Sequence, residues 1–199
     1  MLNLINVTKL YQQKVVLNDM SFNFKQQRYC IVGPNGSGKT TLLMLAAGIE
    51  KPDSGAVLYD DVAVYLDEIK KDIGVSSDRI VLPQFLTGKQ LLEFHCSQHQ
   101  CPYPHEYIEK LNFNVQLTTL VSALSLGNLK KISLLLAISH HPSYLLLDEP
   151  TTGLDKQSRL WLLDFLSEYS GQLIVTSHEE CFVNNSDFHQ LNIVELAEK

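Results

Sequence analysis

The sequence lacks a long apolar run, an excess of basic residues and a leader pattern. Its uninterrupted apolar runs, such as Leu134–Ile138, cover only a few residues, far short of the roughly 18 residues needed to span a membrane as a helix. The 16 basic residues are outnumbered by 22 acidic ones, and the net charge of −6 does not favour binding to nucleic acid. The N-terminus has no basic stretch followed by an apolar core, so no secretory signal is expected. These absences predict a soluble, intracellular protein.

Cysteine is also scarce, and its four copies are scattered rather than arranged as a disulfide framework, so reduced thiols are expected. Apolar residues make up 45% of the 199 residues and charged residues 19%, which favours a sizeable core over disorder. The length suits one domain. We therefore expect a single domain over residues 1–199.

Compact apolar runs without polar alternation occur three times, as is typical of strands buried on both faces. They are Tyr29–Val32, Tyr144–Leu147 and Leu173–Thr176. Helical stretches such as Lys39–Ala47 separate them, which predicts parallel βαβ units in an α/β fold. Residues 2–24 alternate instead, and predict short antiparallel strands joined by a turn at Gln12 and Gln13. Chemistry is expected where loops leave the carboxyl ends of the parallel strands.

The segment Gly33–Thr40 reads Gly-Pro-Asn-Gly-Ser-Gly-Lys-Thr and matches G-x-x-x-x-G-K-[ST] at every fixed position. Its glycines let backbone N–H groups converge, and the positive end of the following helix adds to that attraction for phosphate. Lys39 is expected to contact the β- and γ-phosphates, and the Thr40 hydroxyl to ligate Mg²⁺. The predicted phosphate-binding residues are Gly33, Pro34, Asn35, Gly36, Ser37, Gly38, Lys39, Thr40 and Thr41.

Two carboxylates, Asp148 and Glu149, end the second buried run. Asp148 is predicted to hold Mg²⁺, directly or through water, and Glu149 to accept a proton from an attacking water. His178 follows the third buried run. A lone histidine is more often structural than catalytic, but the strand topology favours a contact with the γ-phosphate here.

In their residues and in their order along the chain, these motifs resemble those of the ATP-binding subunit of an ABC transporter. The resemblance extends over nearly the whole chain. The resemblance implies ATP and Mg²⁺ as cofactors and a P-loop core with an antiparallel β-subdomain. It also implies a small helical subdomain over about residues 88–127. Catalysis would fall to Glu149, Lys39 and His178.

The resemblance gives two further residues a role. Tyr11, in the segment Val7–Tyr11, is similar to the family's aromatic residue that stacks on adenine; the alternative is a strand aromatic that covers the core. Asp155, in Thr151–Asp155, is similar to the aspartate that works across the dimer interface. It is equally suited to cap a helix over Lys156–Tyr169, and the two roles are compatible.

The signature motif departs from the family pattern, because Leu124–Asn128 reads Leu-Ser-Leu-Gly-Asn where Leu-Ser-Gly-Gly-Gln is usual. Ser125 and Gly127 are retained at the start of a helix predicted over residues 129–139, where they can present donors to a phosphate. Leu126 replaces a glycine and is expected to limit how closely the backbone approaches ATP.

The glutamine loop departs as well. Counting back from Leu86–Gly88 places Asp78 at the usual Gln or Glu position, whereas Gln84 is the alternative and lies very close to Thr87. Spacing favours Asp78. Its predicted role is ligation of Mg²⁺ through water.

Two other groups of residues are expected to be structural. Lys130 and Lys131 are predicted on a solvated helix face. The segment His95–His105 holds five potential metal ligands, with His95 and His99 on one helical face, but no C-x-x-C or H-E-x-x-H unit. The pattern favours a polar helix end closed by prolines over a metal site.

The resemblance implies a head-to-tail dimer in which Ser125 of one subunit meets the γ-phosphate on the other. ATP would then favour the closed dimer, and hydrolysis would remove that preference. The second subunit can be another copy or a different ATP-binding chain.

Because the sequence encodes no membrane segment, transport would require a separate transmembrane permease, placing the chain on the cytoplasmic face of the membrane. Export is favoured over import by analogy with compact members of the family. Two alternatives stay open: an ABC-type ATPase acting on ribosomes or DNA, and a regulatory module that binds ATP without turnover.

Overall fold

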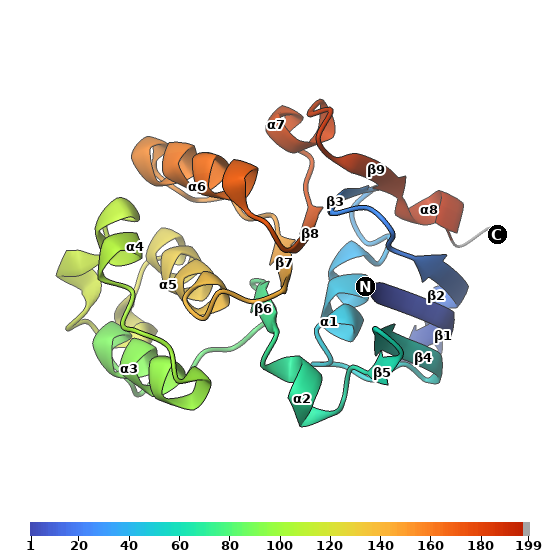
Figure 1. Cartoon of the computed structure of the whole chain (residues 1–199), viewed down its shortest axis with the longest axis horizontal. Helices are drawn as coiled ribbons and strands as arrows, with labels where there is room; N and C mark the ends of the chain where they lie inside the picture. The colour runs from blue at the N-terminus through green and yellow to red at the C-terminus, as the bar shows by residue number, and fades with distance from the viewer. Residues whose placement is uncertain (197–199) are drawn as a thin grey trace.

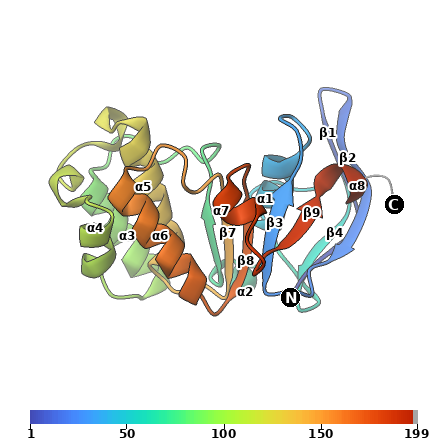
Figure 2. The same cartoon turned by 90° about the horizontal axis from the view of Figure 1, so that it is seen from above.

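The computed structural model describes residues 1–196, apart from the side chains of residues 67 and 68. A parallel sheet lies in the middle of the molecule, with a helical end on one side and an antiparallel sheet on the other (Figures 1 and 2). No helix among residues 1–196 is both long and apolar enough to cross a bilayer.

The parallel sheet has the strand order β6-β7-β8-β3-β9. Its strands are β3 (Arg28–Val32), β6 (Ile73–Ser76), β7 (Tyr144–Asp148), β8 (Gln172–Thr176) and β9 (His189–Asn192). In β7 the side chains of Leu145, Leu146 and Leu147 are fully buried, because helices or the second sheet cover both faces. The three strands predicted from unbroken apolar runs are therefore confirmed.

The antiparallel sheet has the order β2-β1-β4-β5. It comprises β1 (Leu2–Tyr11), β2 (Lys14–Asn23), β4 (Ser54–Tyr59) and β5 (Val62–Ala63). Gln12 and Gln13 form the predicted turn between β1 and β2, and both have positive φ angles, 46° and 69°. Two consecutive positive φ angles match the tight turn whose twist suits a hairpin.

Helix α1 (Lys39–Ala46) lies between the two sheets, and its apolar residues join the core that both sheets share. A second core unites the other face of the parallel sheet with the helical end. That end contains α3 (Gly88–His99), α4 (His105–Lys110), α5 (Leu126–Ile138) and α6 (Lys156–Glu168). Short elements complete the chain: α2 (Asp67–Lys70), η1 (Asn114–Gln116), η2 (Val121–Ala123), α7 (Glu180–Val183) and α8 (Ile193–Leu196).

Helix α5 packs unusually close to β6. A Cβ atom placed on Gly74 would lie 2.0 Å from the carbonyl oxygen of Ala137, so only glycine permits this approach. The helix begins at Leu126, three residues before the predicted start, because the Ser125 hydroxyl caps it by accepting a hydrogen bond from the Asn128 N–H at 3.3 Å.

Candidate active site

The phosphate-binding loop follows β3 and ends where α1 begins. Gly38 precedes the helix with a φ of +99°, and Gly36 has a φ of +80°; both lie in the left-handed region that favours glycine. A Cβ on Gly38 would also lie 2.9 Å from the Leu17 side chain. The unpaired N–H groups at the start of α1 face this loop, as an anion site requires.

Lys39 is the first residue of α1 and is largely buried, with 8% exposure. Its Nζ donates to the carbonyl oxygens of Gly33 at 2.7 Å and Pro34 at 3.1 Å. The loop therefore holds the ammonium group directly beside its own backbone, where it adds a full positive charge to the converging N–H dipoles.

Asp148, at the carboxyl end of β7, accepts hydrogen bonds from three hydroxyl groups. They belong to Thr176 at 2.6 Å, Ser77 at 2.8 Å and Thr40 at 3.2 Å. Oxygen ligands on neighbouring positions of an octahedral Mg²⁺ lie about 3 Å apart, so the Thr40 hydroxyl and the Asp148 carboxylate fit this ion. This geometry agrees with the prediction that Thr40 and Asp148 lie together.

Glu149 follows with a φ of +45°, a strained conformation for a side chain of its size. Its N–H donates to the Thr176 carbonyl at 3.0 Å, which fixes the backbone, and the Ser177 hydroxyl lies 3.4 Å from Oε2. His178 Nε2 lies 3.8 Å from Glu149 Oε1. The two residues predicted for proton transfer and charge stabilisation are therefore neighbours, and both remain partly open to solvent.

Tyr11 lies at the other end of the same cleft. Its hydroxyl donates to Glu50, and the guanidinium of Arg79 lies 5.5 Å from the ring centroid. Arg79 also forms an ion pair with Glu50 at 3.0 Å and reaches the Thr41 hydroxyl at 3.4 Å. Arg79 is not among the residues predicted from the sequence; its position shortly after the buried strand β6 is the signal that could have pointed to it.

The cleft between these groups has a volume of about 410 Å³. It is lined by Tyr11, Val16, Asn35, Gly36, Gly38, Lys39, Thr40, Thr41, Arg79, Asp148 and Glu149. Cationic groups, loop N–H groups and two carboxylates around one cleft can bind a phosphate chain together with a divalent cation and position a water beside a base.

The expectation that Lys130 and Lys131 lie on a solvated face is wrong. They are only 3% and 6% exposed. Lys130 Nζ lies 2.7 Å from Asp78 and donates to the Asp148 carbonyl at 3.1 Å, while Lys131 pairs with Asp155. Tertiary packing buries this helix face, so each lysine extends its stem along the core and finds a carboxylate at its tip.

Asp78 and Gln84, the two candidates for the glutamine-loop role, both lie outside the lining of the nucleotide cleft. They line a separate, mainly apolar hollow of about 440 Å³ together with Val81, Leu126 and Gly153. The Asp78 carboxylate is 77% exposed and paired with Lys130. Its Mg²⁺ role stays a prediction that requires the carboxylate to turn away from this lysine.

Ser125, Gly127 and Asp155 are not brought to the cleft within one chain. Ser125 caps α5, and a Cβ on Gly127 would lie 2.7 Å from the Gly153 carbonyl. Asp155 caps α6 by accepting hydrogen bonds from the N–H and hydroxyl of Ser158, both at 2.9 Å. The predicted cap is confirmed; the predicted role across an interface stays a prediction.

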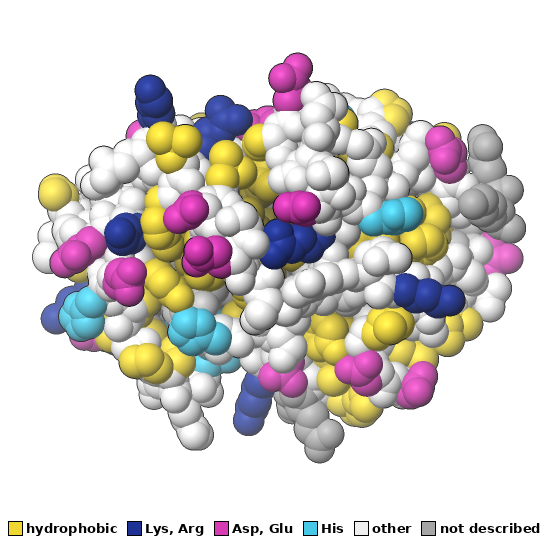
Figure 3. All heavy atoms as spheres, turned by 45° about the horizontal axis from the view of Figure 1, so that its top comes forward, with side chains coloured by type: hydrophobic (Ala, Val, Ile, Leu, Met, Phe, Trp, Pro, Cys, Tyr) yellow, Lys and Arg dark blue, Asp and Glu magenta, His cyan; other side chains and the backbone are white. Residues whose placement is uncertain are grey.

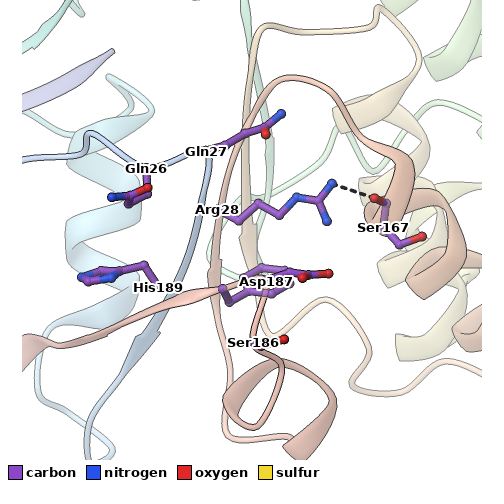
Figure 4. Close-up of a pocket in the computed structure, with 8 residues that line it drawn as sticks. Gln26, Gln27, Arg28, Ser167, Ser186, Asp187 and His189 are labelled. Carbon is purple, nitrogen blue, oxygen red and sulfur yellow. Dashed lines mark hydrogen bonds between the residues drawn. The ribbon is translucent and has the colours of Figure 1, made fainter.

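A larger cavity of about 570 Å³ lies at the amino end of the parallel sheet, away from these residues (Figure 4). Arg28 is its cation, but the guanidinium donates to the Ser167 carbonyl at 2.7 Å and the Tyr169 carbonyl at 3.1 Å. Since two backbone carbonyls already accept hydrogen bonds from this guanidinium, the cavity is a weaker candidate for the functional site than the cleft is.

A phosphate loop after a buried parallel strand, with one carboxylate that fits Mg²⁺ and a second beside it, is the arrangement of a P-loop nucleotide hydrolase. A model of the ABC transporter family matches residues 17–152, well over half of the chain. The chain therefore belongs to the ABC transporter family and carries its ATP-binding ATPase domain. The predicted fold class, with parallel and antiparallel sheets and a helical part, is confirmed.

Several curated proteins are similar to this chain. ATP-binding protein Uup of Buchnera aphidicola is 31% identical over 93% of this chain and 31% of its own length. Ribosome protection protein VmlR of Bacillus subtilis is 32% identical over 94% of this chain and 33% of its own. Linearmycin resistance ATP-binding protein LnrL of the same organism is 28% identical, covering 89% and 61%. The chain thus spans less than two thirds of the length of each of these relatives.

Solved structures share the fold. The cassette MJ0796, described as a dimeric bacterial ABC transporter cassette, has a TM-score of 0.76 and 24% identity, with 100% of this chain and 90% of that one covered. A putative cobalt transport ATP-binding protein has a TM-score of 0.84 and 22% identity, covering 97% and 76%. At these identities the likeness is one of fold.

Proposed function

We propose that this chain is the energy-coupling subunit of an ABC transporter, in which two ATP-binding subunits close on Mg-ATP and drive a separate membrane permease. The proposal rests on which of the predicted site residues line the nucleotide cleft and which lie outside it. Lys39, Asp148 and Glu149 line one cleft, whereas Ser125 and Asp155 lie outside that lining. A second subunit facing the cleft would supply the missing phosphate donors, as the family pattern implies.

The dimer has a direct test in the variant Glu149→Gln, which keeps the side chain's size and removes its basicity. With ATP and Mg²⁺, light scattering after size exclusion is expected to give twice the mass of the chain. Adding Lys39→Ala to the same variant is the control, because a site that cannot hold the phosphates cannot bridge subunits. A monomer in both proteins would overturn a dimer of two copies of this chain.

The proposed permease contact is the apolar hollow beside Asp78. Val81 lines this hollow, is 82% exposed and belongs to the loop that follows β6. An exposed apolar side chain at the rim of an apolar depression suits a partner's helix. That occupant would be a cytoplasmic segment of a membrane-embedded chain, so the proposed location is the cytoplasmic face of the membrane.

Pull-down from solubilised membranes tests this contact. Val81→Asp is expected to lose a captured membrane protein, because burying the new charge in the contact is costly. Val115→Asp is the matched control, since Val115 is also 82% exposed but lies outside the lining of the hollow. Equal capture by both variants would contradict the assignment of this surface.

Export rather than import is part of the proposal, supported by the relative named for linearmycin resistance. Reconstitution with the captured permease gives the direction. In vesicles whose ATPase subunits face outward, ATP-dependent accumulation of the substrate inside would support export, and ATP-dependent loss from preloaded vesicles would support import.

A permease-independent ATPase acting on ribosomes is the second candidate, since VmlR is named a ribosome protection protein and is 32% identical. Against it stands the net charge of −6. On the face shown in Figure 3, acidic and basic side chains are interspersed rather than gathered into a basic stripe. Salt-sensitive cosedimentation with ribosomes, unaffected by Val81→Asp, would favour this candidate.

A further inference from the structure

Three histidines meet at the junction between the helical end and the parallel sheet, away from the nucleotide cleft. His95 and His99 lie one turn apart near the end of α3, and His140 follows α5 in the connection to β7. His95 Nε2 lies 3.2 Å from His140 Nδ1. One ring nitrogen from each of the three residues lies within 4.8 Å of the other two.

This spacing is close to that of a metal site. Zinc bound tetrahedrally by imidazole has Zn–N distances of about 2.0–2.1 Å, which places its ligand nitrogens about 3.3 Å apart. The His95–His140 pair already has that separation, and the rings of His99 and His140 are 4.0 Å apart between centroids. Small rotations of the His99 side chain would complete the arrangement, because i and i+4 residues share one helix face.

We propose that His95, His99 and His140 bind a Zn²⁺ ion, with the fourth coordination position open to solvent. All three side chains are partly exposed, so an ion can reach them. Three nitrogen ligands and one open position are an established coordination pattern for zinc. The proposal concerns a second site and does not depend on the transporter assignment.

The state of the three rings supports ligation. Burial, with the neighbouring imidazoles, lowers the pKa of His95 to about 3 and that of His140 to about 4. Burial and the charge of Lys71 lower the pKa of His99 as well. Burial thus favours the neutral form of each ring, which is the form that has a lone pair for a metal. Lys71 opposes a cation, but its side chain is exposed and can turn into solvent.

Other ligands do not compete for this site. Cys96 lies one residue beyond His95, but its thiol donates to the Pro102 carbonyl at 3.6 Å and does not join the three ring nitrogens. Among the described side chains, no carboxylate joins the three histidines. The site is thus an all-imidazole one, which favours zinc over Mg²⁺ or Ca²⁺.

His140 also shows an unmet hydrogen-bonding need. Its Nε2 is buried without a well-formed hydrogen bond, although the backbone of Ile73 and Leu136 lies near enough to the ring to favour its protonated form. When Nδ1 binds a metal, Nε2 carries the hydrogen and can donate to such a carbonyl with a small adjustment. The surroundings therefore suit the metal-bound tautomer.

The ion would connect two elements that are distant in sequence. His95 and His99 belong to α3, whereas His140 lies four residues before β7, whose far end carries Asp148 and Glu149. Metal binding that needs both elements in place stabilises the folded chain by its binding free energy. Zinc would thus hold α3 against the connection that leads into the catalytic strand.

Isothermal titration of the untagged chain with zinc chloride, in a buffer with a weak competing chelator, tests the proposal. One equivalent of Zn²⁺ per chain is expected. His140→Asn and His95→Asn are each expected to weaken binding at least about 100-fold, since each removes one ligand. His141→Asn and His105→Asn are matched controls outside the cluster, and are expected to bind as the parent does.

Cobalt substitution separates a site from loose surface binding. Co²⁺ in the parent chain is expected to give the strong visible absorption of a tetrahedral complex, and ATP binding confirms that each variant is folded. Loss of the band in His95→Asn and His140→Asn, but not in His141→Asn, would support the triad. Absent binding in the parent, or equal binding in all folded variants, would overturn it.

Discussion

The Nζ atom of Lys130 lies 2.7 Å from Oδ1 of Asp78 and 3.1 Å from the carbonyl oxygen of Asp148. One buried ammonium thus joins the loop after β6 to the end of β7. Because Lys130 belongs to the helix that Ser125 caps, this contact links the signature motif to the carboxylate predicted to hold Mg²⁺ within a single chain. A shift of the loop at Asp78 would therefore act on both the signature motif and Asp148.

Replacing Lys130 tests that link. Lys130→Met keeps the stem but removes the donor to Asp148, so we expect the free energy of unfolding to fall by about 1–3 kcal/mol. Urea denaturation measures the loss. Lys89→Met is the control, since Lys89 pairs with Glu93 at 3.6 Å on an exposed surface, and a change within about 0.5 kcal/mol is expected there. Equal effects would contradict a special role for Lys130.

The unusual residue in the signature gives a second prediction. Leu126 is 85% exposed at the start of α5, in the place where the family resemblance implies a glycine. If its side chain keeps two subunits apart, Leu126→Gly should raise ATP turnover several-fold, and Leu126→Ala should give an intermediate rate. The measurement is steady-state phosphate release at saturating ATP. A rate that falls in the order Leu, Ala, Gly would show that the side chain helps turnover.

Asp155 gives a prediction that depends on pH. Burial alone would raise its pKa, but hydrogen bonds from Lys131 and Ser158 outweigh this and lower the pKa to about 2. The ionised carboxylate therefore stabilises the fold above its unfolded pKa of about 3.9, and this contribution disappears as the pH falls toward 2. Asp155→Asn keeps a good cap and removes only the charge.

Urea denaturation at pH 7 and pH 3 measures the effect. Asp155→Asn is expected to lower stability at pH 7, by less than the full pKa shift implies because the carboxylate is 46% exposed. The difference from the parent should shrink at pH 3. Asp164→Asn, on the exposed face of the same helix, is the control and should show no such trend. A constant difference at both pH values would refute the ion pair's contribution.

The close approach of α5 and β6 predicts a strongly destabilising substitution. Gly74→Ala places a Cβ 2.0 Å from the Ala137 carbonyl oxygen, so helix and strand must separate, at a cost of about 1–3 kcal/mol or more. The melting temperature measured by circular dichroism is expected to fall by several degrees. An unchanged melting temperature would mean that the two elements pack less tightly than described.

The sequence was sufficient to predict three of the five described parallel strands, β3, β7 and β8, together with the turn at Gln12 and the phosphate loop, because each follows from a pattern within a few residues. The extent of the helical subdomain, which the sequence places at about residues 88–127, stays a prediction. The start of α5 was misplaced because the capping role of Ser125 depends on a backbone angle that the residue pattern does not show.

The contacts between distant segments could not be predicted in this way. Lys130 looks like any solvated lysine until α5 is packed against the core. The meeting of His140 with His95 likewise depends on the fold, since nothing in the His95–His105 segment points to it. Thr176 and Ser77 could have been found, because Thr176 ends β8 and Ser77 directly follows β6, at the edge of the sheet where Asp148 lies.

ATP turnover by Glu149→Gln tests the central claim most directly. Glu149 is held at the cleft by a strained backbone and lies 3.8 Å from His178, a geometry suited to accepting a proton from water. Steady-state phosphate release is expected to fall at least about 100-fold, while a fluorescent ATP analogue binds as it does to the parent. Equal rates of phosphate release from parent and variant would contradict catalysis at this site.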